Sequence, residues 1–347
     1  MKRKCTDLLY IPVVVLLLAL SSCVHEMPEE ARGDVYVDLL FDMDLLPTYQ
    51  EVYYNLSRSN RAGRAQQETE MELRYLVRCY PANGDSTFSA VPAYEFNYTN
   101  RDLSQRNYRC HLSLAPGKYK IRVWADYIAV GDITDLFYNT ADFADISIAG
   151  YQQDYQGSTE LRSAFIGEQN IDIPEVTDLD QPVTVGARIE MIRPMARFKF
   201  VTTDLAEFIE KYLGITSPEE AAHVDLSDYQ IMFRYTGFLP THFNIFTDKP
   251  FDAAQGYSFM SSITEAADGE ATLGFDYVFV NGHASSVSVA IGIYNKEGML
   301  LSFSSPIEVP LMRNKQTIVR GRFLTTASSG TIAINEEYDG NYNIVVY

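Results

Sequence analysis

Residues suited to nucleophilic or metal chemistry are few in this sequence. Its 347 residues include 4 cysteines, 5 histidines and 1 tryptophan. The histidines fall in five separate segments, and none lies at metal-ligand spacing from another histidine or from a cysteine. The sequence also has no Gly-x-Ser-x-Gly elbow, no P-loop and no dinucleotide-binding fingerprint. We therefore expect a protein that is not an enzyme and that holds no cofactor or metal.

Basic residues are also scarce relative to acidic ones. Lysine and arginine number 28 against 46 aspartates and glutamates, which gives a formal net charge of −18 at pH 7. Such a surface repels the phosphate backbone of nucleic acids and the headgroups of anionic lipids. The sequence therefore argues against a nucleic-acid partner. It also argues against peripheral membrane binding, so that any membrane attachment has to be covalent.

One apolar run near the N-terminus stands out. Residues 11–20 are apolar and follow a basic start at residues 2–4. The run is too short for a membrane span, which needs about 20 residues, and has the length of the apolar region of a signal peptide. We expect residues 1–22 to be a signal peptide that is removed on export.

The run ends in Leu20-Ser21-Ser22-Cys23, which resembles a bacterial lipobox. The alternative is an ordinary secretory signal with a chance cysteine. With a lipobox, the mature chain starts at Cys23 and is held in the membrane by acyl chains, each buried CH2 contributing about 0.8 kcal/mol. Residues 23–33 would then form a lipidated acidic tether. Removal of the signal peptide leaves 25 basic against 45 acidic residues, a charge of about −20.

Alternation with period two dominates the rest of the chain and predicts β-strands. Apolar side chains at 73, 75, 77 and 79, for example, alternate with Glu72, Arg74 and Arg78. Pro116-Gly117 has the composition of a type II turn between two such strands. Helical patterns are sparse: residues 205–213, with Asp204 and Glu207 as a capping box, and more weakly 159–165.

Many short strands separated by turn residues indicate antiparallel β-sandwiches. The length fits two of them, and Pro194 interrupts the pattern near the middle. We expect an all-β protein with an N-terminal sandwich at residues 34–192 and a C-terminal sandwich at residues 193–347. The two halves share a weak similarity in the order of their strands, which suggests duplication.

Two cysteines remain after Cys5 leaves with the signal peptide and Cys23 is lipidated. Cys79 and Cys110 fall on the inward face of separate predicted strands. An exported protein meets an oxidising compartment, so a disulfide between them is chemically permitted. Two buried free thiols are the other interpretation, because residues on one inward face need not be neighbours.

Two further residues are candidate surface sites. Trp124 lies opposite Ile121 and Val123 in the alternation, so its ring either forms an exposed contact surface or is covered by another segment. Asp85-Ser86-Thr87 resembles the short O-glycosylation motif of exported Bacteroidota proteins, which makes Ser86 a candidate modification site.

Several segments resemble one family of surface proteins. The chain is similar to lipoproteins of the fimbrillin superfamily of Bacteroidota, especially minor-fimbria anchor proteins and a sister family of unknown function. The matching segments are residues 114–126 (LAPGKYKIRVWAD), 193–204 (RPMARFKFVTTD), 309–324 (VPLMRNKQTIVRGRFL) and 332–347. These are strands and turns, so they specify the fold better than an activity.

The resemblance implies two tandem transthyretin-like β-sandwich domains. It further implies an outer-membrane lipoprotein, exposed at the cell surface, that anchors or caps a fimbria-like assembly and contacts fimbrial subunits. It supplies no catalytic residues, and only the lipidated cysteine maps onto this sequence, at Cys23. A surface glycan-binding lipoprotein of a polysaccharide-uptake system is the alternative. A row of coplanar exposed aromatic rings would favour that alternative, and a groove for a foreign strand would favour the fimbrial role.

Overall fold

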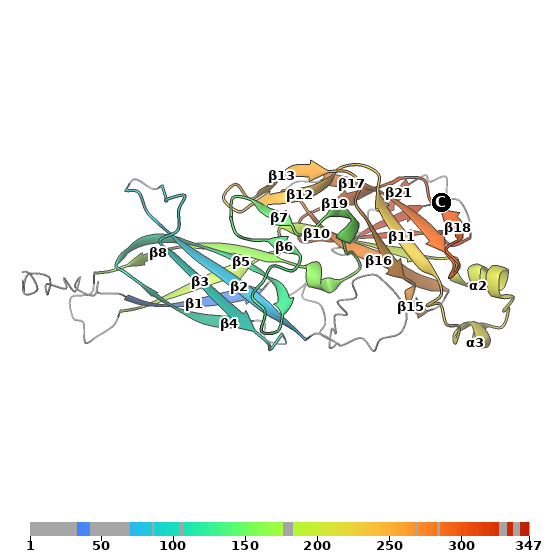
Figure 1. The fold of residues 1–347 in the computed structure, drawn as a ribbon, viewed down its shortest axis with the longest axis horizontal. Coiled ribbons are helices and arrows are strands. Elements are labelled where there is room, and N and C mark those ends of the chain that lie inside the picture. Colours follow the sequence, from blue (N-terminus) through green and yellow to red (C-terminus); the bar gives the residue numbers. More distant parts are fainter. Residues whose placement is uncertain are drawn as a thin grey trace, which may run out of the picture.

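The computed structural model describes residues 33–41, 70–84, 87–103, 107–175, 183–267, 269–282, 285–325, 332–335 and 341–346. The expected signal peptide, the tether with Cys23, and Ser86 lie outside the described residues. The described part is built mainly of strands, which confirms the predicted all-β class (Figure 1). No helix in these ranges has the length and apolar character needed to cross a membrane.

The first sandwich packs a three-stranded sheet, in the order β4-β1-β9, against a four-stranded sheet, in the order β3-β2-β5-β8. Its strands are β1 (Gly33–Phe41), β2 (Met71–Pro81), β3 (Tyr94–Asn100), β4 (Asn107–Leu114), β5 (Gly117–Ala129), β8 (Phe165–Ile173) and β9 (Thr184–Met191). The predicted alternation places Val35, Val77 and Ile121 in the core between the sheets, where each is fully buried.

The second sandwich packs a six-stranded sheet, β15-β16-β10-β20-β22-β21, against a sheet in which β14, β11 and β17 follow one another and both β18 and β19 pair with β17. The strands of the six-stranded sheet are β10 (Met195–Thr202), β15 (Thr264–Ala267), β16 (Glu270–Phe279), β20 (Gln316–Gly321), β21 (Ile332–Asn335) and β22 (Asn341–Val346). The other strands are β11 (Gln230–Tyr235), β14 (Ser258–Ser262), β17 (Ser285–Tyr294), β18 (Leu300–Phe303) and β19 (Ile307–Leu311).

The helices are short and follow the sequence pattern only in part. Helix α2 (Leu205–Leu213) has the predicted bounds and ends at Gly214, whose φ of 71° is left-handed. Asp204 makes no capping bond to the helix. Its carboxylate instead accepts hydrogen bonds from the Thr325 N–H and hydroxyl at 2.9 and 2.6 Å, so the predicted capping box is absent. Helix α3 spans Pro218–Ala221, and the predicted helix at 159–165 is a 3-10 turn, η3 (Glu160–Arg162).

The two sandwiches repeat one topology. In each, the first strand of the half lies in the middle of its sheet, with an antiparallel neighbour on one side and a parallel neighbour on the other. This gives β4-β1-β9 in the first half and β16-β10-β20 in the second. The parallel pairs depart from the purely antiparallel expectation, because period-two alternation marks the buried face of a strand and not the direction of its neighbour. The weak sequence similarity of the halves is thus matched by a shared strand order.

A small four-stranded sheet, β13-β12-β7-β6, is shared between the halves. It joins β6 (Tyr138–Asn139) and β7 (Ile146–Ile148) to the hairpin of β12 (Leu239–Asn244) and β13 (Lys249–Ala254). Strand β7 pairs with β12 through Ser147 opposite His242 and Ile146 opposite Phe243. Residues from the first half therefore cross to the second, although β9 ends before and β10 begins after the boundary expected at 192–193.

Gly167 allows β8 to lie directly against β9, and a side chain there should destabilise the fold. A Cβ at this position would meet Ile189 Cγ2 at 2.5 Å and the Glu190 carbonyl oxygen at 2.8 Å. We expect Gly167→Val to lower the free energy of unfolding by about 1–3 kcal/mol in a urea titration, because the core has to move apart. Gly186→Val is the control, since nothing lies within 4 Å of a Cβ there. Equal stability of the two variants would contradict the close packing of β8 on β9.

Candidate functional site

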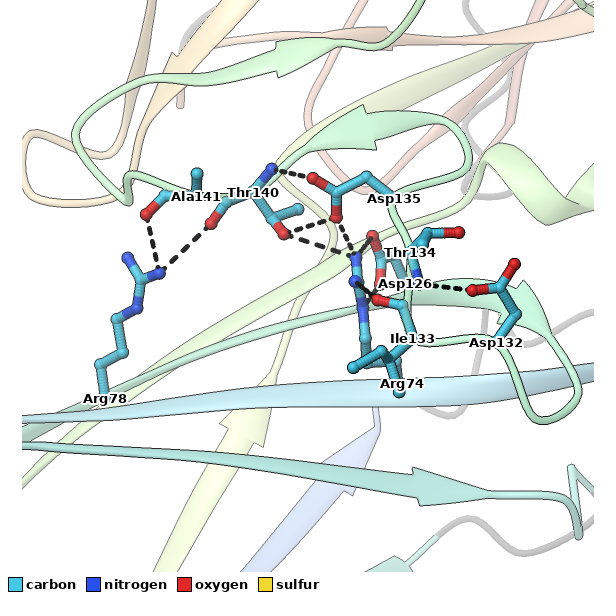
Figure 2. Close-up of polar contacts among 9 residues, drawn as sticks. All are labelled: Arg74, Arg78, Asp126, Asp132, Ile133, Thr134, Asp135, Thr140 and Ala141. Atoms are coloured by element: carbon cyan, nitrogen blue, oxygen red, sulfur yellow. Dashed lines mark hydrogen bonds and ion pairs between the residues drawn. The ribbon is translucent and has the colours of Figure 1, made fainter.

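A buried arginine on the outer face of the first sandwich organises the segment that leads to the second. Arg74 on β2 faces Asp126 on β5, and their side chains are 3% and 2% exposed. The guanidinium donates to both oxygens of Asp126, from Nε at 2.9 Å and from Nη2 at 2.8 Å. It also donates to Asp135 Oδ1 at 2.8 Å and to the Ile133 carbonyl oxygen at 2.9 Å (Figure 2). One cation thus ties the sheet to the loop after β5.

The same loop is fastened at further points along β2. Asp135 accepts hydrogen bonds from the Thr140 N–H and from its hydroxyl, both at 2.8 Å. Arg78, four residues beyond Arg74 on β2, donates to the Ala141 carbonyl oxygen at 2.9 Å (Figure 2). Its guanidinium lies 4.0 Å from the centre of the Phe143 ring. These contacts lay residues 131–143 across the outer face of the sheet and so position β6 and β7.

Trp124 lies beneath this covering segment and is fully buried. Its ring centre is 5.4 Å from that of Tyr138 on β6 and 6.5 Å from that of Phe279 on β16. The interpretation of Trp124 as an exposed contact surface is therefore corrected. The outer face that alternation assigned to this residue is covered, by side chains from both halves of the chain.

A second buried ion pair links the first half of the chain to the second. Asp276 on β16 is fully buried and accepts hydrogen bonds from the hydroxyls of Tyr155 and Tyr235, each at 2.7 Å. Arg162 of η3, itself buried, lies with Nε 3.4 Å from Asp276 Oδ1. Burial raises the pKa of both tyrosines well above its usual value, so their hydroxyls remain protonated donors. The arginine and these donors offset the cost of burying the carboxylate.

The segment that carries Arg162 is inserted into the second sandwich. Tyr155 packs with its ring centre 4.1 Å from the Arg162 guanidinium. The Ser158 N–H donates to the carbonyl oxygen of Phe275 on β16 at 2.7 Å, and Gly157 lies directly against the Phe259 ring of β14. Residues 155–162 therefore fill the opening between β14 and β16, although they belong to the first half of the sequence.

The three-residue connection between the sandwiches is held from both sides. Arg193 donates from Nε to Ser163 Oγ at 2.7 Å, and its carbonyl oxygen accepts from Arg313 Nε at 3.0 Å. Arg313 also pairs with Asp248 at 2.6 Å, in the turn between β12 and β13. The junction thus combines one buried ion pair, Arg162–Asp276, with hydrogen bonds from Arg193 and Arg313, and the geometry is that of a fixed joint.

No group of three or more histidine, cysteine, aspartate or glutamate side chains in the described residues is placed to hold a metal ion. A shallow hollow on the outer face of the six-stranded sheet is lined by two ion pairs, Lys199 with Glu265 and Arg320 with Glu270, so its charges are already neutralised. The ion pairs and hydrogen bonds of the junction hold loop backbone in place and keep the two sandwiches fixed relative to each other.

Cys79 on β2 and Cys110 on β4 both lie in the core of the first sandwich as free thiols. Burial raises the pKa of each thiol to about 12, and their mutual proximity adds to the shift at Cys79. Neither forms a thiolate at neutral pH.

We expect these two thiols to be inert in the native protein. A soluble form without Cys23, treated with iodoacetamide at pH 8.5, should incorporate no label while folded and two labels once denatured without reductant. Mass spectrometry counts the labels. If the denatured protein takes up no label without reductant, the two cysteines had formed a disulfide during export.

The residues that build this junction were not singled out by the sequence. Arg74 and Asp126 stand at outward positions of two apolar strands, which is a readable signal for a buried ion pair. Arg162 and Asp276 are 114 positions apart in the sequence, and no local pattern connects them. The sequence-based sites at Cys23 and Ser86 lie outside the described residues and stay predictions.

A family model matches residues 29–347, nearly the whole sequence. The chain belongs to the family of unknown function DUF6562. The DUF6562 chain is also similar to the fimbrial assembly protein from Parabacteroides distasonis ATCC 8503, with 12% identity, a TM-score of 0.42 and coverage of 92% of this chain and 100% of that chain. It is similar to the fimbrial anchor protein Mfa2 from Porphyromonas gingivalis, with 12% identity, a TM-score of 0.37 and coverage of 78% and 81%. The comparison with curated proteins found no match.

Proposed function

We propose that this protein is a non-enzymatic lipoprotein of the outer membrane, exposed at the cell surface, that anchors or caps a fimbria-like assembly. The lipobox-like sequence at Cys23 supports the membrane attachment, and the strand and turn motifs support the fimbrial role. The observation that carries the proposal is the junction. The buried Arg162–Asp276 pair and a shared sheet hold the two sandwiches as one elongated body, suited to keeping a partner at a fixed distance from the membrane (Figure 1).

The place of the first strand supports an end piece over a repeating subunit. Strand β1 follows the expected tether and lies between β4 and β9, with hydrogen-bonded neighbours on both sides. A foreign strand could replace β1 only if the tethered strand left its sheet, which would remove two ladders of pairing. The central position in this sheet is therefore filled by the chain's own tethered strand.

Isolation from the native envelope tests the proposal. We expect the tagged wild-type protein, extracted in mild detergent, to co-purify with fimbrial subunits identified by mass spectrometry. Cys23→Ala should give a folded protein that leaves the membrane fraction, because no described core residue depends on the lipid. A Cys23→Ala variant that stays in the membrane in high salt would contradict the lipid anchor, and co-purification with polysaccharide-transport proteins alone would contradict the fimbrial role.

One feature favours the alternative, a glycan-binding surface. Tyr94, Phe96 and Tyr98 form a row on the edge strand β3, with ring centres 6.4 and 6.3 Å apart and planes within 12° and 17° of parallel. The rings are half-buried against the core, and Tyr94 Oη accepts from the Ala115 N–H at 3.3 Å. Because the row closes the opening between β3 and β4, we place glycan binding second. Polysaccharide binding that Phe96→Ala abolishes without unfolding would reverse this order.

A further inference from the structure

In each sandwich, the strand by which the chain enters lies beside a parallel strand. Strand β1 lies beside β9, which leads out of the first sandwich, and β10 lies beside β20, which is itself parallel to the C-terminal strand β22. We infer that the protein is a mechanical link in which these parallel pairs are loaded in shear when the chain is pulled between its two ends. The inference rests on the proposed function, in which the N-terminal end is held at the membrane and force arrives from the opposite end.

The first sandwich gives the clearest case. Strands β1 and β9 run side by side from Asp34 opposite Thr184 to Phe41 opposite Met191. The tether enters at the start of β1, and β9 leads from its last residue into the second sandwich. A pull on the tether therefore draws β1 backwards along its own axis, while the second sandwich draws β9 forwards. The two strands can separate only by sliding along each other.

The other neighbour of β1 adds to this resistance. Strand β4 pairs with β1 from Gly33 opposite Leu114 to Leu40 opposite Asn107. Because β1 is central in its sheet, axial withdrawal has to shear both ladders together. In this direction the interstrand hydrogen bonds share the load, whereas a pull across the strands would break them one after another.

The second sandwich repeats the arrangement. Strand β10 begins at the junction and is parallel to β20, with Arg197 opposite Gln316, and β20 is parallel to β22, with Gln316 opposite Asn341. Tension between the start of β10 and the end of β22 therefore passes through two parallel ladders in series. In Figure 1 the C label stands at the end of the second sandwich away from the first.

The joint between the sandwiches suits the same task. Only residues 192–194 separate β9 from β10, so little chain can extend before force reaches the second sandwich. The Arg193 carbonyl oxygen is held by Arg313, and the Arg162–Asp276 pair resists lateral parting. The strand order, the short connection and the buried joint thus place the parallel ladders of both sandwiches on one line of tension.

Single-molecule force spectroscopy with two attachment geometries tests the inference. The soluble chain is held by a tag replacing residues 1–32 and pulled either from the C-terminus or from a handle ligated at Lys118→Cys, in a Cys79→Ala, Cys110→Ala background. Position 118 follows the end of β4 that lies opposite Gly33, so this second pull peels β1 away pair by pair. Both measurements use the same protein and loading rate, so fold stability is matched.

We expect the end-to-end rupture force to be severalfold higher than the peeling force, because forced unfolding is governed by the barrier along the pulled direction. In the end-to-end geometry, each rupture should release a length that matches residues 33–191 or 195–346. Equal forces in the two geometries, or parting of the sandwiches before either unfolds, would overturn the inference. A weak end-to-end response from a protein that still co-purifies with fimbrial subunits would leave the proposed function standing.

Discussion

Replacing Arg162 by methionine should lower the free energy of unfolding by about 3–5 kcal/mol, because it leaves the carboxylate of Asp276 buried without its cation. Both side chains are almost fully buried, with exposed fractions of 3% and 0%. The methionine keeps much of the volume between Tyr155 and Tyr138, so the loss reports the charge and not a cavity. Urea unfolding followed by circular dichroism measures the change.

Two controls separate this effect from a general loss of charge. Lys118 pairs with Asp172 at 3.6 Å, but their side chains are 70% and 67% exposed, so Lys118→Met should leave stability unchanged within error. The double variant Arg162→Met, Asp276→Leu should regain much of the loss, since no unpaired charge remains. A double variant no more stable than Arg162→Met would mean that the tyrosine hydroxyls, and not the ion pair, hold the joint.

Many strands of both sandwiches could be predicted from the alternation in the sequence. Alternation placed Val77 and Cys79 on an inward face, and both are fully buried. The limit of this method is visible at β1 and β9, whose side chains alternate as expected but whose parallel pairing joins strands about 150 residues apart. Period two reports which face is buried, and it carries no information about the partner or its direction.

The junction between the sandwiches was harder to predict from the sequence. Residues 159–165 were expected as a weak helix, and no pattern in the sequence marked residues 155–162 as the segment that fills the opening between β14 and β16. Asp204 shows a related limit. Its position before α2 fits a capping residue, yet the carboxylate binds Thr325, which follows β20. Tertiary contacts overrode the local preference in both cases, because they satisfy buried donors that no local pattern reveals.

The single tryptophan is useful here because it reports one half of the molecule. Trp124 packs in the first sandwich, where its ring meets that of Tyr138, and among the described residues Phe279 of β16 is its aromatic contact from the second half. Its emission should therefore stay blue-shifted as long as the first sandwich is folded, even if the second has lost its structure. Circular dichroism, in contrast, reports the strands of both halves. The two signals together show which sandwich a change affects.

Deleting residues 341–347 should unfold the second sandwich and leave the first intact. Strand β22 lies between β20 and β21, from Gln316 opposite Asn341 on one side and Ile332 opposite Val346 on the other. Its loss leaves one edge of β20 unpaired and removes the partner of β21. Each lost hydrogen bond lowers the free energy of unfolding by about 0.5–1.5 kcal/mol. We expect the strand signal in circular dichroism to fall while the emission of Trp124 stays blue-shifted.

The same deletion decides whether the last strand belongs to its own sheet or is lent to a partner. If the shortened protein keeps both sandwiches folded and remains anchored, but no longer retains fimbrial subunits, then β22 acts in assembly. An open edge at β20 would in that case be tolerated, as edges are when charged side chains protect them. If the second sandwich unfolds, the strand is part of its core, and the partner has to bind a surface that the closed sheet already presents.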